Sequence, residues 1–375
     1  MLKVVTIVGT RPEIIRLSRI IPRLDKSFEH TLIHTGQNYD YSLNEIFFKD
    51  LEIRDPDIFL NIKKDTPMQT IAAVIENIDK ELDRINPDAV LILGDTNSSL
   101  SAIPAKRRKI PIFHMEAGNR CFDFRVPEEI NRRIVDVISD INLTYSDIAR
   151  EYLISEGFEK NRVINTGSPM KEVLDFYKNK INTSQILKNL KLKKHNYFLI
   201  SLHREENVDD KKRLSKLPDV LNTLSKRFDM PVIVSTHPRA KKMIELSDFK
   251  FLDDISFLNP FSFTDYCNLQ INSRCVLSDS GTITEESSIL NFPALNLRIS
   301  HERPEGLEEG SVMSVGLSID NIINALDILD TQSRDKKRDL KIVKDYDVDN
   351  VSEKIIRINL GNIDLVNQNV WHKNI

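Results

Sequence analysis

Residues 4–24 read VVTIVGTRPEIIRLSRIIPRL, a short apolar run followed by a glycine turn and an amphipathic stretch. Val4–Val8 predicts a buried strand and Glu13–Leu24 predicts a helix, and Met68–Ile85 shows the same helical period. Further strands are expected at Thr31–His34, Ala89–Leu93, Ile112–Met115, Ile141–Leu143 and Val163–Asn165. Short buried strands that alternate with helices predict a parallel sheet covered on both faces.

The alternation stops at the polar segment Lys178–His195 and then starts again. In the second half, strands are expected at Tyr197–Leu202, Val232–Thr236, Cys275–Ser278 and Ala294–Leu297, with helices at Lys211–Arg227 and Thr282–Leu290. We therefore predict two doubly wound α/β domains, residues 1–173 and 174–350, that face a cleft. A helical tail is expected at 351–375. Ligands of such sheets bind beyond the carboxyl ends of the strands, so residues at strand ends are the first candidates for a site.

Composition excludes several classes of protein. Lys plus Arg number 53 against 56 Asp plus Glu, a balance that argues against a nucleic-acid partner. No apolar run approaches the ~20 residues that span a bilayer, and the N-terminus shows no signal-peptide pattern. The cysteines Cys121, Cys267 and Cys275 lack metal-ligand spacing, so we expect free thiols and a cytoplasmic location.

Charged side chains follow three strands of the first half. Arg11 comes after the turn at Gly9, and Asp95 and Glu116 directly follow the runs that end at Leu93 and Met115. Arg11 and Asp95 also have ordinary interpretations: a solvated surface arginine for Arg11 and a helix N-cap for Asp95. Glu116 abuts an apolar strand and should therefore be paired or have a raised pKa. The three-glycine dinucleotide fingerprint is absent, which disfavours NAD chemistry.

A helix predicted to start at Pro127 places Glu128 in its first turn and Arg132 one turn later. The pair could be a surface salt bridge, because residues four apart on a helix are neighbours. With Asp95 and Glu116 at adjacent strand ends, Glu128 would complete a carboxylate cluster suited to acid/base work without a metal.

The second half offers cations and a helix start. His203 follows the strand at Tyr197–Leu202, and Ser280-Gly281-Thr282 leads into a helix that carries Glu286. Small residues at a helix N-terminus bind phosphate, although Ser280 or Thr282 could simply cap the helix. Arg303 follows the last predicted strand and brings another guanidinium. These residues suit a nucleotide-activated small molecule, with Glu286 on the ribose.

The ordered set of these motifs resembles the non-hydrolysing UDP-N-acetylglucosamine 2-epimerase family. The set runs from GTRPE at Gly9–Glu13 through GDT, HMEAG, PEEINR, HREEN and DSG to ERPE at Glu302–Glu305. The resemblance implies a GT-B-like fold, usually as a homodimer, and inversion at C2 of a UDP-activated acetamido sugar without cofactor or metal. In that reaction UDP is eliminated to leave a 2-acetamidoglycal and then adds back.

The resemblance also implies roles for single residues. Asp95, Glu116 and Glu128 would be acid/base groups, supported by Arg132, and His203 would join the catalytic set. Diphosphate would be held by His203, Arg11 and the helix start at Ser280, Gly281 and Thr282, ribose by Glu286, and diphosphate or sugar by Arg303. Arg16 stands where the family often has Lys.

The segment from Glu116 to Arg132 is similar to one branch of the family, which converts UDP-2-acetamido-2,6-dideoxy-β-L-talose to UDP-N-acetyl-L-fucosamine for capsule or O-antigen. The general family usually has Leu at position 119, where this chain has Asn119, and a longer insert before its Pro-Glu-Glu. Epimerisation of UDP-GlcNAc to UDP-ManNAc is the nearest alternative. A GT-B glycosyltransferase, a hydrolysing epimerase and a nucleotide-sugar sensor are the others.

Some bacterial members of the family require a second UDP-GlcNAc as an activator, bound in part by a Thr-Gly-Gln-His-Arg segment. The matching text here has Asn38 and Tyr39 in place of His and Arg. Each lost charge-assisted contact is worth about 1.5–3 kcal/mol. We therefore expect initial rates that do not depend on added UDP-GlcNAc.

Overall fold

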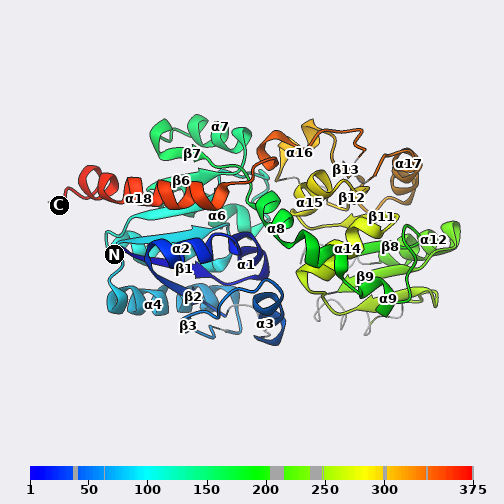
Figure 1. The fold of residues 1–375 in the computed structure, drawn as a ribbon, viewed down its shortest axis with the longest axis horizontal. Helices are drawn as coiled ribbons and strands as arrows, with labels where there is room; N and C mark the ends of the chain where they lie inside the picture. The colour runs from blue at the N-terminus through cyan, green and yellow to red at the C-terminus, as the bar shows by residue number, and fades with distance from the viewer. Residues whose placement is uncertain are drawn as a thin grey trace. The chain divides into compact units, whose positions relative to one another are not determined.

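The chain divides into two compact units, Met1–Asp175 with Asp345–Ile375 and Phe176–Lys344 (Figure 1). The computed structural model describes residues 1–36, 41–62, 64–202, 215–236, 247, 249–298, 302–334 and 337–373. Each unit has its own parallel sheet with helices packed on it, so the prediction of two Rossmann-like α/β domains is confirmed.

The sheet of the first unit has strand order β3-β2-β1-β4-β5-β6-β7 in the part of the chain that is described, and every pair is parallel. Its strands are β1 Lys3–Val8, β2 Glu29–His34, β3 Ile58–Phe59, β4 Ala89–Leu93, β5 Ile112–Ala117, β6 Ile141–Thr144 and β7 Val163–Asn165. The central strand β4 is buried along its whole length, because helices cover both faces of the sheet.

The first unit also contains the following helices: α1 Arg11–Leu17, α2 Ile21–Ser27, α3 Tyr41–Asp50, α4 Pro67–Ile85, η1 Asn97–Ser101, α5 Ala102–Arg107, α6 Pro127–Ile138, α7 Asp147–Ser155, η2 Lys160–Arg162, η3 Lys344–Tyr346 at the boundary, and α18 Val351–Asn369. Helix α8, Met170–Thr183, runs from the first unit into the second. Helix α18 lies beside α2, and its Lys354 Nζ donates to the Thr166 carbonyl at 3.0 Å.

The prediction of a single helix over Glu13–Leu24 is wrong. Two helices occupy the stretch, and the break falls between Leu17 and Ile21. The reason is Pro22, which has no N–H to donate to a carbonyl one turn earlier and instead occupies the first turn of α2.

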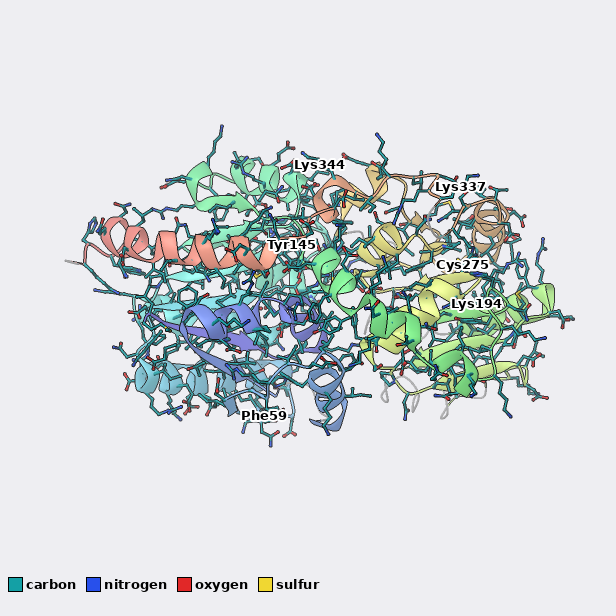
Figure 2. All side chains as sticks on the ribbon, viewed as in Figure 1. Phe59, Tyr145, Lys194, Cys275, Lys337 and Lys344 are labelled. Carbon is teal, nitrogen blue, oxygen red and sulfur yellow. The ribbon has the colours of Figure 1, made fainter. Side chains whose placement is uncertain are left out.

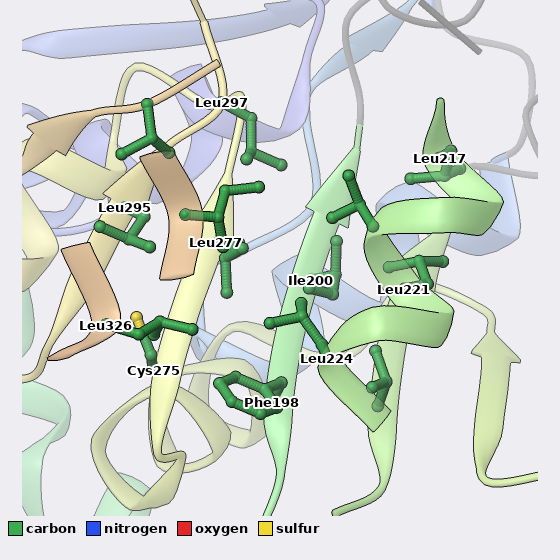
Figure 3. Packing of buried hydrophobic residues seen from close by; sticks show 14 of the residues in the cluster. Phe198, Ile200, Leu217, Leu221, Leu224, Cys275, Leu277, Leu295, Leu297 and Leu326 are labelled. Atoms are coloured by element: carbon green, nitrogen blue, oxygen red, sulfur yellow. The ribbon is translucent and has the colours of Figure 1, made fainter. Parts of the chain in front are cut away.

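In the second unit the described strand order is β10-β9-β8-β11-β12-β13, again parallel. The strands are β8 Phe198–Leu202, β9 Val232–Thr236, β10 Ile255–Leu258, β11 Cys275–Ser278, β12 Ala294–Asn296 and β13 Met313–Ser314. The helices are α9 Ile186–Asn189, α12 Leu217–Phe228, α14 Phe263–Asn272, α15 Ile283–Leu290, α16 Pro304–Glu308 and α17 Ile319–Leu329. Figure 3 shows one side of this core, where Leu221 and Leu224 of α12 pack toward Ile200 of β8.

Both sheets reverse their strand order at one place, between β1 and β4 in the first unit and between β8 and β11 in the second. Loops diverge there, and ligands of doubly wound sheets bind at the carboxyl ends of those strands. The turns at Gly9, Gly94 and Asp279 are therefore the places where the fold favours a site.

Candidate active site

Asp95 stands at the carboxyl end of β4, next to Gly94. Gly94 has φ 76°, a left-handed turn that glycine adopts without strain, and its N–H donates to the Met115 carbonyl of β5 at 3.0 Å. A Cβ at Gly94 would lie 3.5 Å from Glu116 Oε2. The turn therefore sets the carboxylate of Glu116 beside the segment that carries Asp95.

Glu116 sits in β5 at an irregularity of the sheet. The register between β5 and β6 shifts between Met115 and Ala117, and Glu116 has φ 63°. Such bulges re-aim a side chain, and a left-handed backbone costs a residue other than glycine about 1–3 kcal/mol. Glu116 is 8% exposed, and its Oε2 lies 4.0 Å from Arg16 Nε. The pairing expected for this glutamate is observed.

Arg132 of α6 joins these two residues. Its Nη2 donates to the carboxylate of Asp95, and its Nη1 donates to the carbonyl of Glu116 at 2.6 Å. The neighbouring Asn131 donates to the carbonyl of Asp95 at 3.0 Å. Since α6 begins at Pro127 as expected, one helix face holds the ends of both β4 and β5.

Glu128 lies in the first turn of α6 and is half-buried. It precedes Arg132 by one turn, but Arg132 directs its guanidinium at Asp95 and at the Glu116 backbone. Arg132 is 3% exposed and bonds to Asp95 and to the Glu116 backbone, so its role goes beyond a surface salt bridge with Glu128.

Two further arginines belong to α1. Arg16 is 2% exposed, and its guanidinium lies 5.4 Å from the ring centroid of Tyr145, a residue marked in Figure 2. Arg11 opens α1 with its guanidinium 5.5 Å from the ring of Phe47. Arg16 is thus a buried cation beside Glu116, and Arg11 is the more accessible one.

Glu13 is a buried carboxyl group that the sequence analysis did not single out as a site residue. Its Oε2 accepts from Gly9 N at 2.5 Å and from Thr10 N at 2.8 Å, and its Oε1 accepts from Thr96 Oγ1 at 2.7 Å. Burial, together with repulsion from Asp95, raises the pKa of Glu13 to about 7 despite these hydrogen bonds.

A buried polar network lies behind the cluster. His114 of β5 places Nε2 2.8 Å from the Gly94 carbonyl and Nδ1 3.0 Å from Asp136 of α6. Arg120 also contacts Asp136, at 2.7 Å, and pairs with Glu156 at 2.6 Å. Burial works against it, but the hydrogen bond and charge of His114 and the charge of Arg120 lower the pKa of Asp136. The network fixes the loop before Asp95.

In the second unit, the turn after β11 leads into α15. Ser280 Oγ lies 3.0 Å from Thr282 Oγ1, and Ser280 N–H donates to Ser278 Oγ at 3.0 Å. Thr282 is the N-cap residue of α15, yet its side chain makes no capping hydrogen bond. Helix capping therefore does not explain why the chain has a threonine at position 282.

Arg303 lies against the same turn. A Cβ on Gly281 would meet Arg303 Nε at 4.0 Å, and Arg303 Nη2 pairs with Glu285 of α15 at 3.1 Å. Both charged side chains are nearly inaccessible, at 4% and 0% exposure. The structure thus brings together Gly281 and Arg303, which are far apart in sequence.

Glu286 follows on α15 and is 7% exposed. Gln270 of α14 donates to Glu286 Oε2 at 2.5 Å, a contact the sequence did not indicate. The amide fixes the carboxylate that was predicted to bind ribose.

Three expectations fall outside the described residues. His203, which follows β8 directly, is one, and Asn38 and Tyr39 are the others. Within the described ranges, no three His, Cys, Asp or Glu side chains gather as metal ligands, and no helix there has the length and apolarity to cross a membrane.

Comparison with known proteins identifies the family. A model of the family described as UDP-N-acetylglucosamine 2-epimerase matches residues 23–359. The chain belongs to this family. A solved UDP-N-acetylglucosamine 2-epimerase from Rickettsia bellii is 52% identical, covers 100% of both chains and superposes with a TM-score of 0.94.

Other epimerases of the family are more distant. The Methanocaldococcus jannaschii UDP-GlcNAc 2-epimerase, solved in complex with UDP-GlcNAc and UDP, is 34% identical over 96% of this chain and 100% of its own, with a TM-score of 0.89. UDP-2,3-diacetamido-2,3-dideoxy-D-glucuronate 2-epimerase from Pseudomonas aeruginosa is 32% identical over 86% of this chain and 91% of its own. The chain is an isomerase of the UDP-N-acetylglucosamine 2-epimerase family, with the GT-B-like pair of domains.

Proposed function

We propose that this epimerase inverts C2 of a UDP-2-acetamido sugar by eliminating UDP and adding it back. The observation that carries the proposal is that Arg132 donates hydrogen bonds both to the Asp95 carboxylate and to the carbonyl of Glu116. Arg132 fixes the carboxylate of Asp95 and the backbone of Glu116 at adjacent strand ends. A reaction that removes a proton from one face of a ring and returns one to the other needs two acid/base groups.

The C2 proton has no neighbouring carbonyl, so its removal must be coupled to departure of UDP. One carboxylate takes the proton while the C1–O bond breaks, and the C–H electron pair forms the C1–C2 double bond of a 2-acetamidoglycal. A phosphate oxygen of UDP then bonds to C1 as a carboxylic acid delivers a proton to the opposite face of C2. We assign these transfers to Asp95, Glu116 and Glu128, with His203 in the catalytic set.

The leaving diphosphate develops negative charge that cations and N–H dipoles stabilise. We assign this work to Arg11, Arg303 and the turn of Ser280, Gly281 and Thr282. Glu286, fixed by Gln270, would bind the ribose hydroxyls. Arg16 and Arg132 would hold the carboxylates.

For the sugar, we propose UDP-2-acetamido-2,6-dideoxy-β-L-talose, converted to UDP-N-acetyl-L-fucosamine. The support is the segment from Glu116 to Arg132 and, within it, Asn119. This side chain is 3% exposed, and its Nδ2 has no hydrogen-bond partner among the described residues. A buried donor three residues after Glu116 is a group that a sugar oxygen can satisfy and that Leu cannot supply.

Interconversion of UDP-GlcNAc and UDP-ManNAc is the second candidate. It is favoured by the names of relatives such as the Rickettsia bellii and Methanocaldococcus jannaschii UDP-GlcNAc 2-epimerases. The Pseudomonas aeruginosa relative, named for a diacetamido-glucuronate substrate, is similar to this chain at nearly the same identity as the latter. Family membership alone therefore leaves the sugar open.

The test is to incubate the enzyme with each UDP-sugar and follow the H1–H2 coupling by proton NMR. The proposal predicts faster turnover of the L-talose-type substrate, and an Asn119→Leu variant that loses that preference. Inversion of UDP-GlcNAc alone would establish the second candidate. We further propose cytoplasmic homodimers that supply precursors of surface polysaccharide, which sedimentation of the purified protein and deletion of its gene would test.

A further inference from the structure

The role of Glu13 is larger than capping a helix. Its Oε2 caps α1 through Gly9 N and Thr10 N, but its Oε1 accepts from Thr96, 83 residues later in the chain. One carboxylate therefore ties the loop after β1 to the loop after β4. These are neighbouring strands at the place where the strand order reverses.

The two loops are packed without spare room. A Cβ on Gly9 would lie 1.9 Å from Ser98 Oγ, so this position tolerates only glycine. Ser98 Oγ in turn lies 2.7 Å from Thr35 Oγ1 at the end of β2. Thr96 lies two residues before Ser98 in the same loop, and its hydroxyl bond to Glu13 fixes the residue next to Asp95.

Another helix of the same chain shows what capping alone requires. Helix α4 also begins with a reciprocal capping box, formed by Thr66 and Gln69, and both residues are exposed. A neutral amide is enough there. At Glu13 the chain instead buries a carboxyl group to 2% exposure beside another carboxylate, where ionisation is unfavourable. Two acceptor oxygens, which a carboxylate has and an amide lacks, serve both loops at once.

We propose that Glu13 is a positioning residue for Asp95 and acts through Thr96. The inference rests on the proposed function, in which Asp95 exchanges protons with the sugar. Arg132 holds the Asp95 side chain and Asn131 its carbonyl, both from α6. Glu13 holds the next residue from α1. Asp95 is thereby fixed by contacts from both α6 and α1. Loss of either set of contacts would let its carboxylate move away from the position in which it reaches C2.

The hydroxyl of Thr96 gives the cleanest test. Thr96 precedes η1 but makes no capping hydrogen bond to it, so Thr96→Val removes the bond to Glu13 and nothing else that is described. We expect Thr96→Val to lower kcat about ten-fold or more, as loss of a hydrogen bond to a charged group would. KM and UDP affinity should stay within about three-fold, since Thr96 is not expected to touch substrate. Thr96→Ser keeps a hydroxyl and should restore most of kcat.

The matched control is Gln69→Ala, which damages the capping box of α4 and should lower the melting temperature without lowering kcat. The inference would be overturned if Thr96→Val and Thr96→Ser had the same kcat. It would also be overturned if Gln69→Ala lowered kcat as much as Thr96→Val does. Wild-type protein that inverts neither UDP-sugar would instead overturn the proposed function, and this inference with it.

Discussion

Arg132 and Asp95 form an ion pair in which the arginine side chain is 3% exposed and the carboxylate 16% exposed. A second guanidinium nitrogen of Arg132 donates to the carbonyl of Glu116 at 2.6 Å. The planar fork of arginine reaches both acceptors at once, whereas a lysine ammonium is a single point of charge. One side chain therefore fixes the spacing between the ends of β4 and β5.

Arg132→Lys should therefore lower kcat although the charge is kept. Loss of one charge-assisted hydrogen bond corresponds to about 1.5–3 kcal/mol, or roughly 10- to 150-fold. Steady-state kinetics on the UDP-sugar would measure it. Arg357→Lys is the control, because that side chain is 78% exposed and pairs locally with Glu353 on α18. Equal activity in both variants would contradict the role given to Arg132.

The amide variants Asp95→Asn, Glu116→Gln and Glu128→Gln keep shape and remove the ionisable group. Each should lower kcat by about 10²–10⁴-fold, the usual contribution of a general acid or base. UDP affinity, measured by calorimetry, should stay near the wild-type value. Glu151→Gln, on the exposed side of α7, is the matched control. If one of these variants turns over normally, the residue that it replaces does not belong to the catalytic set.

Glu286→Gln should weaken UDP binding, because the ribose would lose a charged acceptor. We expect about ten-fold or more in Kd, from the loss of a hydrogen bond to a charged group. Titration calorimetry with UDP alone isolates this step from catalysis. Glu308, at the end of α16, is exposed and serves as the control. The Kd for UDP should not change in Glu308→Gln. Unchanged affinity in Glu286→Gln would place the ribose elsewhere.

His34 makes stability depend on pH. It is fully buried at the end of β2 and stacks on Phe59 at 4.9 Å, and its Nδ1 accepts from Gly36 N–H at 3.0 Å. Burial lowers the pKa of His34 from 6.5 to about 4. Above pH 6.5 both folded and unfolded states are neutral at this residue. As the pH falls from 6.5 to 4, only the unfolded state takes up the proton, and stability drops by up to about 3 kcal/mol.

Urea unfolding at pH 7.5 and pH 5 would measure this loss. His34→Gln should show a smaller drop in unfolding free energy between the two pH values. His372→Gln, at an exposed position, should keep the wild-type drop. An identical drop in all three proteins would show that His34 is protonated in the folded state.

The sequence predicts most strands well because each is a short, mainly apolar run bounded by a turn. Ala89–Leu93, Val163–Asn165, Val232–Thr236 and Cys275–Ser278 have the predicted bounds. Three strands were missed. The strands β3 and β13 have two partly buried or exposed residues each, too few for a periodic signal, and β10, Ile255–Leu258, is buried only at its first residue. The expected helical tail is present as α18, which begins at Val351 and ends at Asn369.

Much of the site could be placed from strand order alone. Asp95 and Glu116 had to be neighbours once β4 and β5 were adjacent parallel strands. The contacts between elements could not be read this way. The bond of Glu13 to Thr96 depends on how two loops pack, and that of Gln270 to Glu286 on how α14 lies against α15. Motifs show which residue types are present, but only packing shows which of them form hydrogen bonds with one another.

The central claim is that the C2 proton is lost and replaced. The most direct measurement is proton NMR of the product after one turnover of the UDP-sugar in deuterated water. The elimination mechanism predicts deuterium at C2 of the epimerised sugar, because the acid that delivers the new proton exchanges with solvent. Epimerised product that retains full protium at C2 would contradict it.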